Sequence, residues 1–202
     1  MHTVILTFDG FNEIDSFVAL GILGRIKRPD WRVSIATPTP RVTSMNGVTI
    51  EGQCSLEDAR SADAVIVGSG MKTRDIVADP KQLAAIQLNP QKQLVGSQCS
   101  GALILAKLGL LNGVPACTDS ITRPWVLEAG VEVSEQPFFS RDNLATAGGC
   151  LASHYLAAWV IARLESVEAA EAALRYVAPV GEKDDYVSRA LSWITPRPCP
   201  AR

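Results

Sequence analysis

Short aliphatic runs alternate along the chain with segments of helical periodicity, and this alternation restricts the possible folds more than any other feature of the sequence. Runs typical of buried strands occur at residues 3–8, 31–37, 64–67, 93–97, 116–118 and 131–133. Helices are predicted over residues 15–28, after Asp79-Pro80, and over 102–111, 124–129, 151–164 and 167–177. Strands separated by helices predict a mostly parallel central sheet with helices on both faces. We therefore expect an α/β fold.

Turn and capping residues add local detail to this prediction. Asn46-Gly47 interrupts residues 42–51 with the chemistry of a two-residue hairpin, which we expect at an edge of the sheet. A second hairpin is predicted around Asp142-Asn143, and Asp15-Ser16 can cap the first helix. No linker divides the chain, so residues 1–194 are expected to form one domain. Residues 195–202 contain three prolines and are expected to be a tail without regular helix.

Composition and charge argue against nucleic-acid and membrane partners. The 202 residues are 47% hydrophobic and 20% charged, as in a globular domain with a sizeable core. A formal net charge of -2, without any long basic run, gives no electrostatic footprint for phosphate backbones. The longest apolar stretches, broken by Lys107 or by His154 and Arg163, are shorter than the ~20 residues of a membrane span, and the N-terminus has no signal-peptide pattern. We expect a cytoplasmic protein.

Cysteine and histidine usage narrows the available chemistry. The five cysteines are odd in number, widely spaced and without a Cys-x-x-Cys motif, which argues against a disulfide scaffold or a zinc finger. His2 and His154 are the two histidines of the chain, so a zinc site or a serine-histidine triad has few residues to be built from. No metal and no cofactor are therefore expected.

One segment has the pattern of a nucleophile elbow. Cys99 lies between the strand at 93–97 and the helix at 102–111, with small residues on both sides. A tight turn from strand to helix exposes a side chain at the carboxyl edge of the sheet, and the helix N-terminus favours a thiolate. The backbone amide of Ser100 can donate to an oxyanion there. The simpler alternative is that Cys99 is a small buried core residue, the usual place of a free cysteine.

Four stretches, taken together and in this order, resemble the ThiJ/PfpI superfamily, which has the class I glutamine amidotransferase-like fold. They are an opening strand with an acidic turn, a strand ending in small residues, the cysteine elbow with its helix, and a late strand with a glycine turn: residues 4–15, 65–70, 96–113 and 143–149. The resemblance covers nearly the whole chain. It implies a flavodoxin-like three-layer sandwich and a homodimer.

The resemblance also implies roles for individual residues. Asp15 corresponds to the acidic residue that reaches the cysteine from the first strand, with Glu13 as the competing acid; Asp15 is preferred because the family's acid directly precedes the first helix. Asp15 as a plain helix N-cap is the structural alternative. Ser69 or Gly70 corresponds to the second oxyanion donor, beside Ser100.

Departures from the superfamily pattern favour one branch. Protease-like members commonly have histidine directly after the cysteine, where this chain has Ser100, and other branches often have histidine near the position of Asp119. The resemblance is therefore nearest to isocyanide hydratases, which need no histidine. It implies that Cys99 attacks the terminal carbon of a small isonitrile and Asp15 protonates the developing centre. A thioimidate forms, and water converts it to an N-formamide.

Cys150 supports an alternative function. It follows Gly148-Gly149, where the superfamily usually has an aliphatic residue beside the elbow, so Cys99 and Cys150 are expected to be close. Cys150 then either resolves an oxidised Cys99 as a disulfide or fills the space of an aliphatic side chain. The first case corresponds to a redox-responsive or ligand-binding member of the superfamily without turnover.

Overall fold

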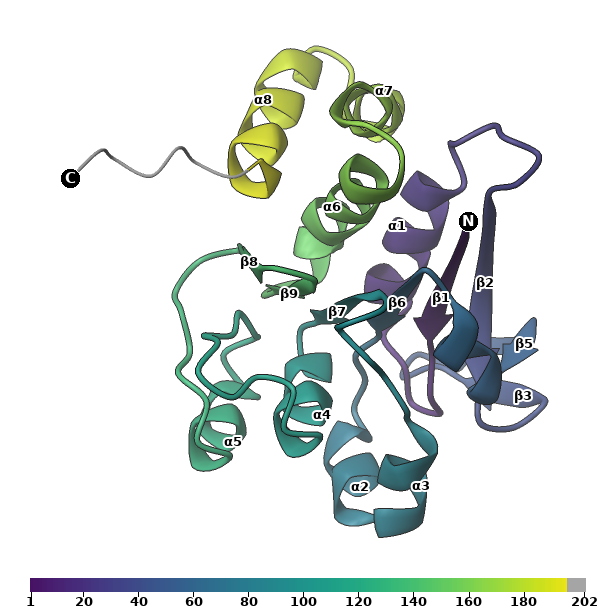
Figure 1. Cartoon of the computed structure of the whole chain (residues 1–202), viewed down its shortest axis with the longest axis vertical. Coiled ribbons are helices and arrows are strands. Elements are labelled where there is room, and N and C mark those ends of the chain that lie inside the picture. Colours follow the sequence, from purple (N-terminus) through teal and green to yellow (C-terminus); the bar gives the residue numbers. More distant parts are fainter. Residues whose placement is uncertain (196–202) are drawn as a thin grey trace.

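The core of the protein is a seven-stranded sheet (Figure 1). The computed structural model describes residues 1–195. The strand order is β5-β2-β1-β6-β7-β9-β8, parallel except for the last pair. In chain order the strands are β1 His2–Leu6, β2 Arg32–Thr37, β5 Cys54–Ser55, β6 Ala64–Val67, β7 Leu94–Gln98, β8 Phe138–Arg141 and β9 Leu144–Ala147. The predicted α/β fold with a mostly parallel sheet is confirmed.

Helices cover both faces of this sheet and complete a three-layer sandwich (Figure 1). One layer contains α1 Glu13–Leu23, α6 Ser153–Leu164, α7 Val167–Val177 and α8 Lys183–Ile194. The other contains α2 Thr73–Ala78, α3 Pro80–Ala85, α4 Gly101–Lys107 and α5 Arg123–Glu128. None of the helices in residues 1–195 combines the length and apolar character needed to cross a lipid bilayer.

Side chains alternate between the two layers along each central strand. Ile5 and Ile66 pack under α1 and α6, whereas Val65 and Val67 face the layer that contains α4. Both faces of a parallel sheet are buried, so its strands consist of nearly continuous apolar runs. The aliphatic run at 64–67 has this property and is fully buried.

Several predicted elements differ from the structure. α8 was not predicted, because its sequence is rich in charged residues. The segments at 116–118 and 131–133 form a single bridge, Ala116 to Val133, rather than two strands. α1 is capped by Asn12, whose side chain accepts a hydrogen bond from Ile14 N, so Asp15-Ser16 is not its cap. Residues 196–202, most of the predicted tail, lie outside the described residues.

Both predicted hairpins are present, but one is placed differently. β8 and β9 are joined by Asp142-Asn143, with Asp142 at a left-handed φ of 54°. The other hairpin consists of β3 Arg41–Thr43 and β4 Thr49–Glu51, which form a separate two-stranded sheet. Ser44 N–H donates to Val48 O, and Ser44 Oγ accepts from Val48 N, so the turn spans residues 45–47 and is longer than the predicted two residues. Because β3 and β4 form a sheet of their own, the hairpin does not extend the edge of the main sheet.

Candidate active site

Cys99 occupies a strained turn between β7 and α4. Its φ is 42°, and it is one of two residues other than glycine with positive φ in residues 1–195. Two hydrogen bonds hold the turn: Cys99 N donates to Ala147 O at 2.8 Å, and Thr118 Oγ1 donates to Cys99 O at 2.8 Å. A side chain held in this sparsely populated region is a recurrent feature of functional sites. The structure therefore has the geometry of a nucleophile elbow.

Gly101 allows the helix after the elbow to lie directly on the sheet. A Cβ at this position would be 2.5 Å from Val67 O and 2.9 Å from Gly68 O. Both atoms belong to backbone that cannot move without displacing β6 or the loop after it. Any larger residue would push α4, and with it Cys99, away from β6.

Gly101→Ala is therefore expected to lower the free energy of unfolding by about 1–3 kcal/mol, the usual cost of overpacking a close contact. The matched control is Gly21→Ala in α1, where a Cβ has nothing within 4 Å. This change is expected to raise stability by up to about 1 kcal/mol, because alanine is the better helix former. Urea unfolding of both variants measures the difference. Equal stability of the two variants would contradict the tight approach of α4 to the sheet.

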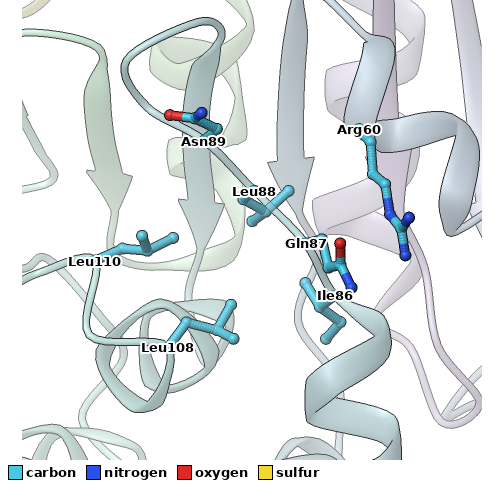
Figure 2. A pocket seen from close by; sticks show the side chains of 7 residues that line it. All are labelled: Arg60, Ile86, Gln87, Leu88, Asn89, Leu108 and Leu110. Atoms are coloured by element: carbon cyan, nitrogen blue, oxygen red, sulfur yellow. The ribbon is translucent and has the colours of Figure 1, made fainter.

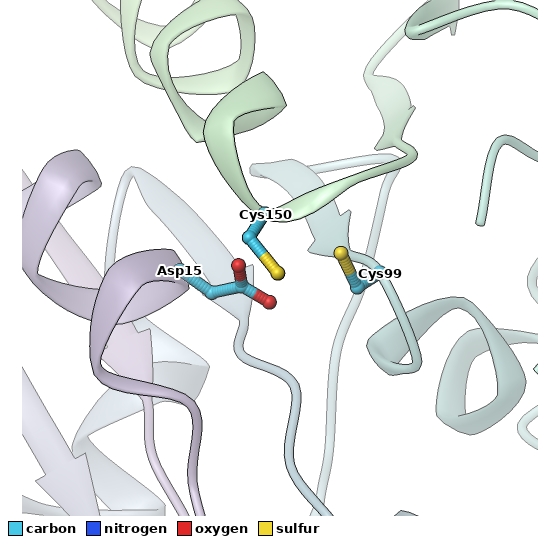
Figure 3. Close-up of side chains that lie close together, drawn as sticks. All are labelled: Asp15, Cys99 and Cys150. Atoms are coloured by element: carbon cyan, nitrogen blue, oxygen red, sulfur yellow. The ribbon is translucent and has the colours of Figure 1, made fainter. Parts of the chain in front are cut away.

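Three ionisable side chains from distant parts of the sequence meet at the elbow (Figure 3). One oxygen of Asp15 and the sulfurs of Cys99 and Cys150 all lie within 4.8 Å of one another. Asp15 is in the first turn of α1, and Cys150 begins the short 3-10 helix Cys150–Ala152 that precedes α6. The sheet brings them together because β1, β7 and β9 end at the same edge. The expected proximity of Cys99 and Cys150 is confirmed.

Asp15 is buried with only part of its hydrogen-bonding capacity used. Its exposed fraction is 1%, Ser69 Oγ donates to its Oδ2, and its Oδ1 has no hydrogen-bond partner within residues 1–195. Burial raises the pKa of the Asp15 carboxyl above its usual range, although the hydrogen bond from Ser69 acts in the opposite direction. Asp15 can therefore hold a proton beside Cys99 at a higher pH than an ordinary aspartate.

The thiol of Cys99 is held in its neutral form more firmly than the sequence indicates. Its exposed fraction is 3%, and burial, followed by the charges of Asp15 and Cys150, raises its pKa well above the usual range. A helix N-terminus favours a thiolate, but here desolvation and like charge outweigh it. The predicted thiolate-favouring environment is therefore wrong for the isolated chain, and Cys99 needs a base or a bound ligand to become an anion.

Asp15→Asn is expected to move the pH midpoint of Cys99 alkylation to lower pH. The substitution removes the carboxylate charge that disfavours the thiolate, so the thiol pKa falls. Iodoacetamide labelling at a series of pH values, with mass-spectrometric assignment to Cys99, measures the midpoint. Glu13→Gln is the control and should leave it unchanged, because Glu13 lies apart from this cluster. A midpoint that rises in Asp15→Asn would mean that the carboxyl group acts mainly as a hydrogen-bond donor to the thiolate.

The structure separates Asp15 from the other acidic candidates. Glu13 accepts hydrogen bonds from Ser44 Oγ and Asn46 Nδ2, so it faces the β3–β4 loop. Asp119 accepts from the N–H groups of Ile121 and Thr122 and caps the turn before α5. Its charge contributes to the raised pKa of Cys99 without contact. Neither acid replaces Asp15 in the cluster.

The two candidates for the second oxyanion donor are also distinguished. Gly70 N already donates to Ser100 Oγ at 3.1 Å, and Ser100 Oγ pairs with Thr73 Oγ1 at 2.7 Å. Ser69 N is therefore the better candidate beside Ser100 N.

Two residues of the site were missed by sequence reasoning. Asn12 Nδ2 donates to Cys150 Sγ at 3.1 Å, and Gln98 Nε2 lies 3.8 Å from Cys99 Sγ. Asn12 carries a local signal, since asparagine before a helix is a common N-cap. Gln98 carries none, because a glutamine at the end of a buried strand has many possible partners.

Four cavities among residues 1–195, with volumes of about 240 to 520 Å³, lie away from this cluster. One, of about 360 Å³, is lined by Ile86, Leu88, Leu108 and Leu110 with a polar margin that includes Arg60 (Figure 2). It has no acidic or thiol side chain, so it offers no groups for the chemistry of Cys99.

Comparison of the sequence with known proteins identifies a family and a relative. The model of the DJ-1/PfpI family matches residues 1–163. Isonitrile hydratase of Pseudomonas putida is 28% identical over 131 residues, covering 64% of this chain and 58% of that protein, so the match spans less than two thirds of the relative.

Two solved structures show the same fold at low sequence identity. Schizosaccharomyces pombe DJ-1 has a TM-score of 0.75 at 17% identity, covering 89% of this chain and 100% of that one. A ThiJ/PfpI family protein from Pseudomonas syringae has a TM-score of 0.76 at 19% identity, covering 96% and 87%. With the family model matching most of its length, the chain belongs to the DJ-1/PfpI family.

Proposed function

We propose that this protein is a cysteine-dependent enzyme that hydrates small isonitriles to N-formamides, with Cys99 as nucleophile and Asp15 as acid and base. The observation that carries the proposal is the placement of a buried carboxyl group beside a cysteine on a strained elbow. The similarity to an isonitrile hydratase supports the choice of substrate.

Histidine-dependent hydrolysis fits the site less well. His154 Nδ1 pairs with Leu151 O, and its ring packs at a tilt against the rings of Tyr155 and Tyr186. His2 pairs with Ser34 Oγ on the neighbouring strand β2. Both histidines are thus engaged within the fold, whereas Asp15 faces Cys99 directly. A carboxyl group is therefore the acid and base that this site offers.

The reaction follows from moving one proton between two neighbouring groups. Ionised Asp15 takes the proton of the Cys99 thiol, and the sulfur forms a bond to the terminal carbon of the isonitrile. Asp15 then gives this proton to that carbon, which produces a thioimidate on Cys99. Water adds to the same carbon, the nitrogen gains a proton, and the carbon–sulfur bond breaks to release the N-formamide and the thiol. One water is consumed, and Asp15 serves as base and acid in turn.

The raised pKa of Asp15 suits this double role. A general acid and base works best when its pKa is near the working pH, and burial moves the pKa of Asp15 in that direction. The N–H groups of Ser100 and Ser69 are assigned to stabilise charge that develops during water addition.

We further propose that the active form is a cytoplasmic homodimer. The cytoplasm keeps thiols reduced, as a nucleophilic cysteine requires. Ile14 and Leu151, the neighbours of Asp15 and Cys150, are exposed apolar side chains at the site. A second copy of the chain would cover them and enclose the substrate.

The test is to incubate the reduced protein with a panel of alkyl and aryl isonitriles and to detect N-formamides by mass spectrometry. Turnover is expected in the wild type and is expected to be lost in Asp15→Asn. Full activity in Asp15→Asn would contradict the role of Asp15 as acid and base. Absence of any formamide with the wild type would contradict the proposed hydratase function.

The position of Cys150 supports a second candidate function, a redox-responsive protein without turnover. Its sulfur lies within 4.8 Å of that of Cys99, and a thiol at this distance can attack a sulfenic acid to give a disulfide and water. Mild peroxide followed by peptide mapping distinguishes the candidates. A stoichiometric Cys99–Cys150 bridge in a protein that hydrates no isonitrile favours this second function.

A further inference from the structure

The cluster at the elbow has the ligand composition of a metal site as well as that of a nucleophile. Asp15 offers a carboxylate oxygen, and Cys99 and Cys150 each offer a sulfur, with all three atoms within 4.8 Å of one another. In a tetrahedral zinc site, with Zn–S bonds of about 2.3 Å, neighbouring ligand atoms are about 3.7 Å apart. The three atoms therefore need to approach by about 1 Å or less. Figure 3 shows the three side chains directed toward one another.

Asp15 presents an unused ligand atom to this space. Its Oδ1 is buried and has no hydrogen-bond partner among the described residues, although its Oδ2 accepts from Ser69. An unsatisfied buried oxygen is costly, and native proteins seldom leave one without a function or a bound ligand. Because the side chain is 1% exposed, bulk water does not supply the missing partner. The carboxyl group that meets the two sulfurs thus keeps one oxygen free for a ligand.

The charge balance of the cluster also favours a cation. Each of the three groups is an acid that is negatively charged when it has lost its proton, and their ligand atoms lie within 4.8 Å of one another. The three ligands cannot all ionise in a buried space without a positive charge among them. A divalent cation removes this repulsion.

Neighbouring residues position Cys150. Asn12 Nδ2 donates to Cys150 Sγ at 3.1 Å, an interaction that stabilises and orients a thiolate. Cys150 follows Gly149, whose φ of 90° suits glycine, and begins a short 3-10 helix rather than a long rigid element. The small approach that a metal requires can be accommodated there. The sequence predicts no metal site, because these three ligands are widely separated along the chain.

We propose that the reduced protein binds one thiophilic divalent cation, Zn²⁺ in the cell, through Asp15, Cys99 and Cys150, with water in the fourth position. Each thiol gives up its proton on binding, and no oxidation occurs. Two thiolates and one carboxylate are a ligand set that suits Zn²⁺ and the softer Cd²⁺. The bound cation is coordinated by the sulfur of Cys99, so this sulfur cannot attack an electrophile in the metal-bound form. The proposal does not depend on the substrate of Cys99.

Cadmium titration of the reduced, metal-free full-length protein tests the site. Binding of Cd²⁺ to thiolates produces an ultraviolet charge-transfer band, and native mass spectrometry gives the stoichiometry. We expect one Cd²⁺ per chain, displaced by Zn²⁺. Cys150→Val and Cys99→Ala are expected to weaken binding by at least about 100-fold, the upper range for loss of a supporting group around a metal. Asp15→Asn should keep the band and weaken binding.

A matched control separates the site from other thiols. Cys54→Ser changes a cysteine outside the cluster and is expected to keep both the band and the stoichiometry. Thermal melts show whether each variant is folded. An unchanged band in Cys150→Val, or no binding to the folded wild type, would overturn the proposal. Because the readout is metal binding, its failure is independent of any failure to hydrate isonitriles.

Discussion

Cys99→Ala is expected to lower the rate of isonitrile hydration by at least about 1,000-fold, because it removes the atom that forms the covalent intermediate. The substitution removes one sulfur from a buried position. The fold should persist because the turn is held by the backbone groups of residue 99, whose N–H donates to Ala147 O and whose C=O accepts from Thr118 Oγ1. The measurement is formamide production under saturating isonitrile, with the melting temperature recorded on the same sample.

Cys54→Ser is the control for this experiment. Cys54 lies on β5, the first strand in the sheet order, and its sulfur contacts Ile35 O rather than the cluster at the elbow. Its replacement should leave turnover within about twofold of the wild type, as for a half-buried residue outside the site. Cys99→Ala with near-normal turnover would show that another group performs the chemistry. A covalent adduct trapped on Cys99 by mass spectrometry would identify the nucleophile directly.

Trp159→Ala is expected to reduce the free energy of unfolding by about 3–5 kcal/mol, the usual cost of truncating a buried tryptophan. Trp159 lies in α6, is 1% exposed and packs against Phe138, with ring centroids 6.5 Å apart. Its loss leaves a cavity between α6 and the sheet that the neighbouring elements cannot fill. Since domains are stable by only about 5–15 kcal/mol, a large fraction of the total would disappear. Urea unfolding followed by circular dichroism gives the value.

Val180→Ala is the comparison, because Val180 is 93% exposed in the loop between α7 and α8. It is expected to change stability by less than about 0.5 kcal/mol. Trp159→Phe should fall between the two, since a smaller ring fills part of the space. A loss below about 1 kcal/mol in Trp159→Ala would mean that the layer of α1, α6, α7 and α8 packs less tightly than the structure indicates.

The fold class was predictable because burial leaves a direct signature in the sequence. β6 coincides with the predicted strand at 64–67, and α7 with the predicted helix at 167–177. Parallel strands buried on both faces require continuous apolar runs, and Ser166 caps α7 with its own side chain. α8 escaped prediction because its first turn is charged, with Asp184 and Asp185, and its buried face is small.

Turns were predictable where their chemistry is local. Asp142-Asn143 joins β8 and β9 directly, whereas the loop after Thr43 is shaped by a serine side chain that bonds across it. Whether a hairpin joins the main sheet depends on distant strands. Local turn residues therefore predicted that β3 and β4 pair, but not where the pair lies.

The sequence by itself determined the elbow and its cysteine, because a strand, a turn of small residues and a helix follow one another within a short segment. The tertiary structure decided the rest of the site. Asp15, Cys99 and Cys150 meet because three parallel strands end at one edge of the sheet, and residues far apart in the chain carry no local mark of that meeting. The protonation of Cys99 also depends on the fold, because desolvation is set by all the atoms that surround the sulfur, and these come from several separate elements.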